Sequence, residues 1–199
     1  MKKVLWLILL ITICILPSRA GVVIYTDATA FQAALLSYSV ETFTGNVINT
    51  AGLSFSSTAG SITGELFSDR VVNGADSTTW TLPSAMNGFG GYWDLTPQGA
   101  GQGLEFFIDG VTLVSQEVPN TYSGQFFGFI SDATFTSVKI DGGTQLPGSI
   151  AETYNVDNLT FGIAGTTPPP PSETPEPATF GLIGAALLAI GARSFRKAS

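Results

Sequence analysis

Short runs of alternating apolar and polar residues fill the chain between residues 21 and 164. In the clearest run, Leu104, Phe106 and Ile108 alternate with Glu105, Phe107 and Asp109, and a period of two residues indicates a β-strand. Asp109-Gly110 follows this run and precedes a second apolar run, a pattern typical of a β-hairpin. Similar runs between Gly, Asn, Asp and Ser clusters predict strands at residues 22–25, 40–43, 53–56, 64–72, 78–82, 125–130, 134–140 and 154–161.

A single segment near the start of this region has helical periodicity instead. Asp27 is a suitable N-cap, and Phe31, Ala34 and Leu35 share one face of a helix over residues 28–36. The pattern therefore predicts an all-β domain over residues 21–164 with one short N-terminal helix. Strands at roughly ten-residue spacing, rich in β-branched and aromatic residues, indicate a β-sandwich of the jelly-roll, lectin-like kind.

Two phenylalanine-rich runs, Phe106-Phe107 and Phe126-Phe127-Gly128-Phe129, are apolar at consecutive positions. Strands that are buried on both faces have this pattern, so we expect both runs to belong to the core. The alternative is that one outward-facing set of rings forms a platform on which a ligand stacks.

The first twenty residues have the pattern of a secretory signal peptide. Lys2-Lys3 precede an apolar run over residues 4–16, and Ser18-Arg19-Ala20 ends in small residues, so signal peptidase is expected to cut between Ala20 and Gly21. The alternative is an uncleaved amino-terminal anchor. Cleavage would remove the one cysteine, Cys14, and would leave a mature chain without disulfides.

The other end of the chain has a different composition. Residues 165–174 are rich in proline, which favours an extended polyproline linker. Pro175-Glu176-Pro177 is followed by an uncharged apolar run over residues 178–192 and then by Arg193, Arg196 and Lys197. This run predicts a transmembrane helix with its basic end in the cytoplasm. At about 1.5 Å per residue, it would reach only about three-quarters of the way across a ~30 Å hydrocarbon core.

A proline-flanked glutamate, a short helix of small apolar residues and a basic tail at residues 175–199 resemble the PEP-CTERM sorting signal of bacterial exported proteins. The resemblance implies processing by an exosortase near Pro175, Glu176 and Pro177. It also implies a precursor anchored in the inner membrane, with delivery to the cell surface or extracellular matrix.

Charge and composition exclude several functions for residues 21–164. This region contains thirteen acidic residues and two cationic ones, Arg70 and Lys139, which gives a net charge of -11. Nucleic acid is therefore excluded as a partner, because phosphate binding needs clustered Lys and Arg. The chain has no histidine, the usual general base, and no Gly-x-Ser-x-Gly motif. We expect no catalytic residues, although two carboxylates alone could serve a glycoside hydrolase.

The predicted domain also resembles ectodomains that commonly accompany this sorting signal. Their β-sandwich shape is similar to that of carbohydrate-binding modules and lectin-like jelly rolls. The segments that carry the resemblance are Tyr25-Thr26-Asp27, Phe31, Val40-Glu41-Thr42-Phe43, Gly88-Phe89-Gly90-Gly91-Tyr92-Trp93-Asp94, Phe127-Gly128-Phe129-Ile130-Ser131-Asp132 and Val156-Asp157-Asn158-Leu159-Thr160-Phe161.

Aromatic residues outside the phenylalanine runs give a first candidate site. Trp80, Tyr92 and Trp93 have large amphipathic rings that can stack on sugars, and the glycines before Tyr92 suggest a binding loop. The alternative is that Trp93 fills the core.

The resemblance to carbohydrate-binding sandwiches implies a second candidate site, a structural calcium ion that ties an early strand to the last one. Its ligands here would be Glu41 and Asp157, helped by Asn158 or Asp94, since calcium prefers several oxygen ligands. The alternative is that Glu41 is solvated and that Asp157 accepts hydrogen bonds in a turn. No other cofactor is expected.

Together these patterns predict an exported protein of the cell surface or matrix, with a structural or adhesive ectodomain in exopolysaccharide or biofilm. The alternatives are a carbohydrate-binding module for exopolysaccharide and a glycoside hydrolase.

Overall fold

The computed structural model describes residues 21–99, 101–146 and 150–165, which form ten strands, one α-helix and a short 3-10 helix. The predicted signal peptide, the PEP motif, the transmembrane helix and the basic tail lie outside these residues. In chain order the elements are β1 (Val22–Tyr25), α2 (Ala28–Ala34), β2 (Leu35–Glu41), η1 (Thr44–Asn46), β3 (Ser54–Ser56), β4 (Ser61–Thr63), β5 (Leu66–Val72), β6 (Thr78–Asp94), β7 (Leu104–Ile108), β8 (Thr112–Leu113), β9 (Ser123–Gly142) and β10 (Ala151–Ala164).

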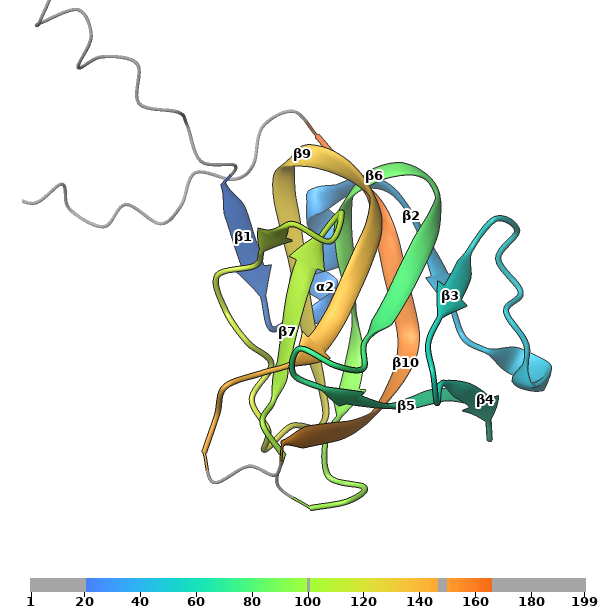
Figure 1. Cartoon of the computed structure of the whole chain (residues 1–199). Coiled ribbons are helices and arrows are strands. Elements are labelled where there is room, and N and C mark those ends of the chain that lie inside the picture. Colours follow the sequence, from blue (N-terminus) through green and yellow to red (C-terminus); the bar gives the residue numbers. More distant parts are fainter. Residues whose placement is uncertain (1–20, 100, 147–149, 166–199) are drawn as a thin grey trace, which may run out of the picture. The chain divides into compact units, whose positions relative to one another are not determined.

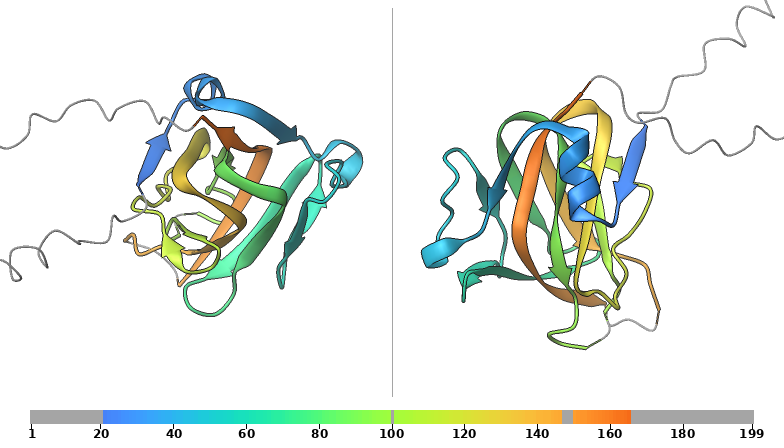
Figure 2. Two further views of the ribbon diagram at one scale, coloured as in Figure 1. Left: turned by 90° about the horizontal axis from the view of Figure 1, so that it is seen from above. Right: turned by 180° about the vertical axis from the view of Figure 1, so that it is seen from behind.

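Three long antiparallel strands, β10, β6 and β9, form the centre of the sheet, whose main order is β4-β5-β10-β6-β9-β7-β8. The shorter strands β1, β2 and β3 pair with β9, β10 and β6 respectively. The long strands curve strongly, so different halves of the same strand belong to opposing layers of the domain (Figures 1 and 2). The predicted all-β class with one short helix is confirmed.

A dense aromatic core lies between the layers. Phe106 of β7 stacks on Phe127 of β9, with centroids 5.6 Å apart and an interplanar angle of 14°, and Phe129 also packs in this core. Phe126 points to the opposite face of β9, where Phe31 of α2 covers it at a centroid distance of 5.3 Å. The prediction that both phenylalanine runs belong to the core is thus confirmed for these rings, and α2 explains how β9 is apolar on both faces.

The helix and the hairpin form close to where the sequence predicts them. Asp27 caps α2 by accepting a hydrogen bond from the Ala30 amide at 2.7 Å. The helix ends at Ala34, two residues early, because Leu35 adopts an extended backbone and begins β2. Asp109, with φ 48°, and Gly110, with φ 70°, form the turn between β7 and β8.

The largest difference from the predicted strands concerns residues 88–94, where a binding loop was expected at Tyr92-Trp93-Asp94 after the glycines. They are the second half of β6, and the predicted strands at 125–130 and 134–140 are one continuous β9. The glycines serve close packing between strands: a Cβ on Gly90 would lie 2.7 Å from the Gly128 Cα across the ladder. Glycine inside a strand often marks such a close backbone approach.

Across the described ranges 21–99, 101–146 and 150–165, no helix has the length and apolar character needed to span a membrane.

Candidate functional site: a groove beside the helix

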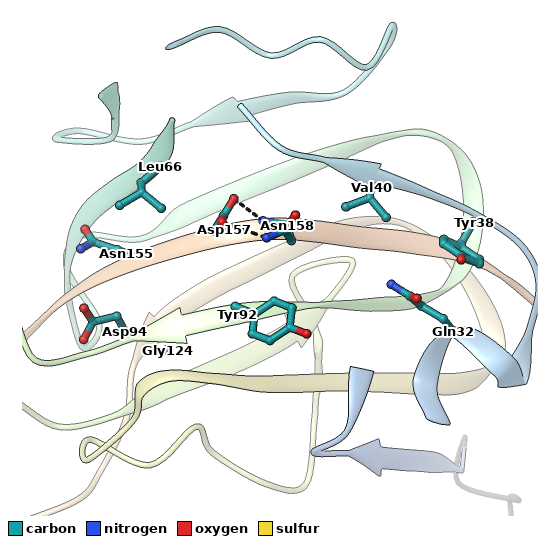
Figure 3. Close-up of a pocket in the computed structure, with 10 residues that line it drawn as sticks. All are labelled: Gln32, Tyr38, Val40, Leu66, Tyr92, Asp94, Gly124, Asn155, Asp157 and Asn158. Atoms are coloured by element: carbon teal, nitrogen blue, oxygen red, sulfur yellow. Dashed lines mark hydrogen bonds between the residues drawn. The ribbon is translucent and has the colours of Figure 1, made fainter. Parts of the chain in front are cut away.

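An open groove of about 760 Å³ lies on the outer face of the sheet, next to α2 (Figure 3). Its lining residues come from six elements, so distant parts of the chain build it together. The lining residues are Gln32 of α2, Tyr38 and Val40 of β2, Leu66 of β5, Tyr92 and Asp94 of β6, Gly124 of β9, and Asn155, Asp157 and Asn158 of β10.

The pairing of β10 with β6 sets the centre of the groove. Asp157 lies opposite Tyr92, and Asn155 lies opposite Asp94. Residues opposite each other in an antiparallel pair have Cβ atoms about 4.5–5.5 Å apart, and alternate residues share a face. The ladder therefore places a ring, an amide and two carboxylates side by side.

A β-bulge in β10 adds a further polar side chain. The register shifts between Asp157 and Thr160, and Asn158 adopts a left-handed backbone with φ 50°. Asp157 accepts hydrogen bonds from the Asn158 amide at 2.6 Å and from Asn158 Nδ2 at 2.8 Å. Consecutive strand residues normally point to opposite faces, so the bulge allows both Asp157 and Asn158 to line the groove.

Two tyrosines supply the aromatic surface of the groove. Tyr92 has 39% of its surface exposed and packs edge-on against Phe126, with centroids 5.5 Å apart. Tyr38, on the edge strand β2, is 48% exposed. Phe126 holds the Tyr92 ring in place while leaving it accessible, the arrangement expected of a ring that stacks on a ligand.

The prediction that Trp80 and Trp93 present their rings to a ligand is wrong, because both are fully buried. Trp93 Nε1 donates a hydrogen bond to the Phe127 carbonyl at 2.9 Å, and its ring packs against Phe106 at 5.1 Å. Trp80 packs against Phe67 at 4.8 Å. Strand alternation gives the reason for Trp93: its neighbours in β6 face the groove, so it faces the core.

Glu41 is buried, and it organises the loop that follows β2. Its carboxylate accepts hydrogen bonds from the backbone amides of Phe43, Asn49 and Thr50 at 2.7–2.8 Å. Burial alone would raise the pKa of Glu41, but these hydrogen bonds outweigh it and lower the pKa. Both oxygens are occupied by donors, which repel a cation. Each Glu41 oxygen already accepts two hydrogen bonds, which leaves no acceptor position for a cation and argues against a calcium ion shared by Glu41 and Asp157. The alternative of a solvated Glu41 is wrong, because the side chain is buried. Asp157 accepts hydrogen bonds from Asn158, in a bulge of β10 instead of the expected turn.

We expect chelation to leave the stability of the ectodomain unchanged. Within the described residues no three Asp, Glu, His or Cys side chains are arranged to hold a metal ion, and Glu41 is already satisfied by N–H groups. The check is a thermal melt in EDTA and in calcium chloride. A midpoint that falls in EDTA and recovers with calcium would contradict this expectation.

A second cavity, of about 540 Å³, lies around Glu152 at the start of β10 and shares no lining residue with the groove. Glu152 is buried, its Oε2 accepts the Gly103 amide hydrogen bond at 2.7 Å, and its Oε1 has no hydrogen-bond partner among the residues the structure describes. Burial raises the pKa of Glu152 to about 7, against the lowering effect of the hydrogen bonds from Gly103 and Thr153.

Sequence reasoning found four groove residues, Tyr92, Asp94, Asp157 and Asn158, although it assigned them to two different sites. It missed the other six because no motif links them, and only the fold brings them together. Of the predicted cleavage pair, Gly21 is described and its amide donates to Asp132 Oδ2 at 2.8 Å. Ala20, Pro175, Glu176, Pro177, Arg193, Arg196 and Lys197 lie outside the described residues.

Comparison with known protein families decides the role of the C-terminal segment. Residues 173–197 match the PEP-CTERM protein-sorting motif. The chain carries a PEP-CTERM sorting signal. This signal indicates an exported protein whose precursor is anchored in the membrane. The match covers the C-terminal segment alone, so it does not describe the ectodomain.

The ectodomain of this PEP-CTERM protein has distant structural neighbours. One is a mutant of a family 29 carbohydrate-binding module, with 14% identity and a TM-score of 0.43, covering 68% of this chain and 99% of that one. Another is the catalytic domain of a family GH87 α-1,3-glucanase in complex with tetrasaccharides, with 14% identity and a TM-score of 0.37, covering 71% of this chain and 30% of that one. No curated protein matches. At these scores neither likeness bears on the ligand of this chain.

Proposed function

We propose that the ectodomain is a non-catalytic, polysaccharide-binding module that attaches the exported protein to exopolysaccharide at the cell surface or in the matrix. The observation that carries the proposal is the groove, in which the exposed ring of Tyr92 lies among carboxylate and amide side chains. In this proposal the protein adheres to the matrix by binding polysaccharide and does not serve as a passive structural component.

The chemistry of the groove suits a sugar chain. A pyranose ring has an apolar face of C–H groups, which an exposed tyrosine can cover, and a rim of hydroxyls that need donors and acceptors. Tyr92 supplies the ring, while Asp157 and Asn158 supply acceptors and donors beside it. Asn155 also lines the groove, and its amide is held by a hydrogen bond that its Oδ1 accepts from Ser68 Oγ at 2.7 Å.

The size and openness of the groove also support a polymer ligand. Its volume lies within the range of about 300–1,000 Å³ that is typical of ligand sites. It lies on the outer surface of the curved sheet, on strands whose core-facing side chains are densely packed, so its walls are rigid. Preformed walls lower the entropic cost of binding.

The sorting signal gives this binding a cellular setting. We propose that signal peptidase acts at the amino terminus, and that an exosortase processes the precursor near Pro175–Pro177 and delivers it to the surface or matrix. There the ectodomain would encounter exopolysaccharide. Mass spectrometry of both termini of the protein recovered from the native cell surface tests this route.

Tyr92→Ala is expected to weaken polysaccharide binding at least about tenfold, because it removes the stacking surface. The exposed ring contributes little to packing, so the melting temperature should change little. The check is a glycan array of the purified ectodomain, followed by calorimetric titration of the best oligosaccharide.

Leu113→Ala is the matched control, because Leu113 is a similarly exposed large side chain that lies outside the groove. It should bind as the unmodified ectodomain does. If no saccharide on the array is retained, or if the two variants bind equally well, the groove is not a polysaccharide site.

A further inference from the structure

We propose that the groove prefers saccharides that carry amino groups and rejects those that carry carboxylates. This inference rests on the polysaccharide-binding function proposed above, and it names the class of polymer. Its basis is the charge of the groove: Asp94 and Asp157 are the charged side chains among the ten lining residues, and both are acidic.

The hydrogen bonds of the two carboxylates leave acceptor positions available. Among the described residues, Asp94 accepts hydrogen bonds at Oδ1 from the amide and the hydroxyl of Thr96, at 3.0 and 2.7 Å. In Asp157, each oxygen accepts one hydrogen bond from Asn158. A carboxylate oxygen can accept two hydrogen bonds, so both side chains can still bind a ligand.

No cationic side chain lines the groove to neutralise these carboxylates. The two cationic residues of the ectodomain sequence, Arg70 and Lys139, lie outside the groove lining: Arg70 lines the cavity around Glu152, and Lys139 Nζ lies 2.9 Å from Asp141 Oδ2. Lys139 also lies over the ring of Phe107, 5.5 Å from its centroid. Within the described ranges, therefore, the lining of the groove carries two negative charges and no positive one.

The register of β10 and β6 places the two carboxylates where a chain of sugars would meet both. Asp157 lies opposite Tyr92, and Asp94 is two residues further along β6 on the same face. A sugar stacked on Tyr92 would present its substituents to Asp157, and the next unit would reach Asp94. An ammonium group forms a charge-assisted hydrogen bond with either carboxylate, whereas a uronate would meet like charge.

The net charge of -11 over residues 21–164 attracts cationic polymers to every part of the surface, so the test must separate the groove from the general field. The probes are hexasaccharides of glucosamine, N-acetylglucosamine and galacturonic acid, titrated into the ectodomain at about pH 5.5 to keep the amines charged. The titrations are repeated at about 20 and about 300 mM salt to show the electrostatic share.

The variants are Asp94→Asn with Asp157→Asn and, as a matched control, Asp76→Asn with Asp132→Asn. Both pairs remove two negative charges, but the control pair lies outside the groove. Far-ultraviolet circular dichroism and a thermal melt check that both variants are folded. Tyr92→Ala is titrated alongside them to show that each probe binds in the groove.

We expect the glucosamine hexamer to bind about tenfold more tightly than the N-acetylated hexamer, and the galacturonic acid hexamer to bind most weakly. The preference should disappear in the groove variant and persist in the control variant. Equal or tighter binding of the N-acetylated or acidic hexamer would overturn the inference while leaving polysaccharide binding intact. Equal loss in both variants would assign the preference to the general field and would also overturn it. If none of the hexamers binds while another saccharide on the glycan array does, the inference fails and polysaccharide binding stands; if nothing on the array binds, the proposed function fails as well.

Discussion

Trp93→Ala should remove a large share of the folding stability of the ectodomain, whereas Tyr92→Ala, one residue away, should remove much less. Trp93 is fully buried, packs against Phe106 and Tyr154, and donates its indole hydrogen bond to the Phe127 carbonyl. Loss of a buried tryptophan costs about 3–5 kcal/mol, which is a large share of the about 5–15 kcal/mol that stabilises a typical domain.

Urea denaturation followed by circular dichroism measures this effect, with Tyr92→Ala as the neighbouring control. The buried carbonyl of Phe127 would lose its partner as well, which adds to the cost of the cavity. A Trp93→Ala variant that unfolds within about 1 kcal/mol of the unmodified ectodomain would show that residue 93 lies on the surface, and would invalidate the strand alternation that defines the groove.

Glu152→Gln is expected to stabilise the ectodomain above neutral pH and to have little effect in acid. Burial raises the pKa of Glu152 from 4.5 to about 7, so the folded protein holds this proton more tightly than the unfolded chain does. The stabilisation from the protonated form is complete below about pH 4.5 and is lost as the pH rises through about 7. The loss is on the order of 2–3 kcal/mol, and glutamine, which stays neutral, avoids it.

The measurement is the urea midpoint between about pH 4.5 and about pH 8.5 for the unmodified ectodomain and the variant. Glu65→Gln is the control, because it removes an exposed carboxylate and so reports the general repulsion among the many acidic groups. The stability difference between Glu152→Gln and the control should grow through neutral pH. Parallel curves for the two variants would mean that Glu152 is ionised in the folded protein without cost.

The pKa of Glu41 shifts in the opposite direction from that of Glu152, although both are buried glutamates, and the sequence alone does not predict this difference. Three backbone amides donate to Glu41, whereas Gly103 and Thr153 are the donors that act on Glu152, and the pKa is lowered in the first case and raised in the second. Both glutamates belong to strands of ordinary polar and apolar residues. Their surroundings depend on loops folding over them, which a periodic pattern does not encode.

The elements themselves were largely predictable because each depends on local chemistry. Asp27 predicts the start of α2, Asp109-Gly110 predicts the hairpin, and Leu104 to Ile108 predict β7. The segment at residues 88–94 was misassigned, because glycine indicates a turn in most sequences. Here Gly90 lies against Gly128 across the ladder, a contact that depends on long-range pairing.

Four of the groove residues were predicted to have a function, but the sequence did not show that they lie together. Tyr92 was expected to bind a ligand, and Asp94, Asp157 and Asn158 were expected to bind an ion. Their union follows from the register of β10 on β6 and from the bulge at Asn158. Tyr38 and Gln32 were missed. Both lie more than fifty residues before Tyr92, the first groove residue that the sequence identified.

The bulge at Asp157 and Asn158 affects how the groove surface can change during evolution. Removing one residue there would remove the bulge and leave Leu159 and Phe161 in the core, but only one of the two polar side chains would still line the groove. Replacing the side chains at 157 and 158 leaves the residue count unchanged. Lineages can therefore acquire new ligand preferences here by substitution at unchanged geometry, whereas a deletion would keep the core and cost the groove one of its two adjacent polar groups.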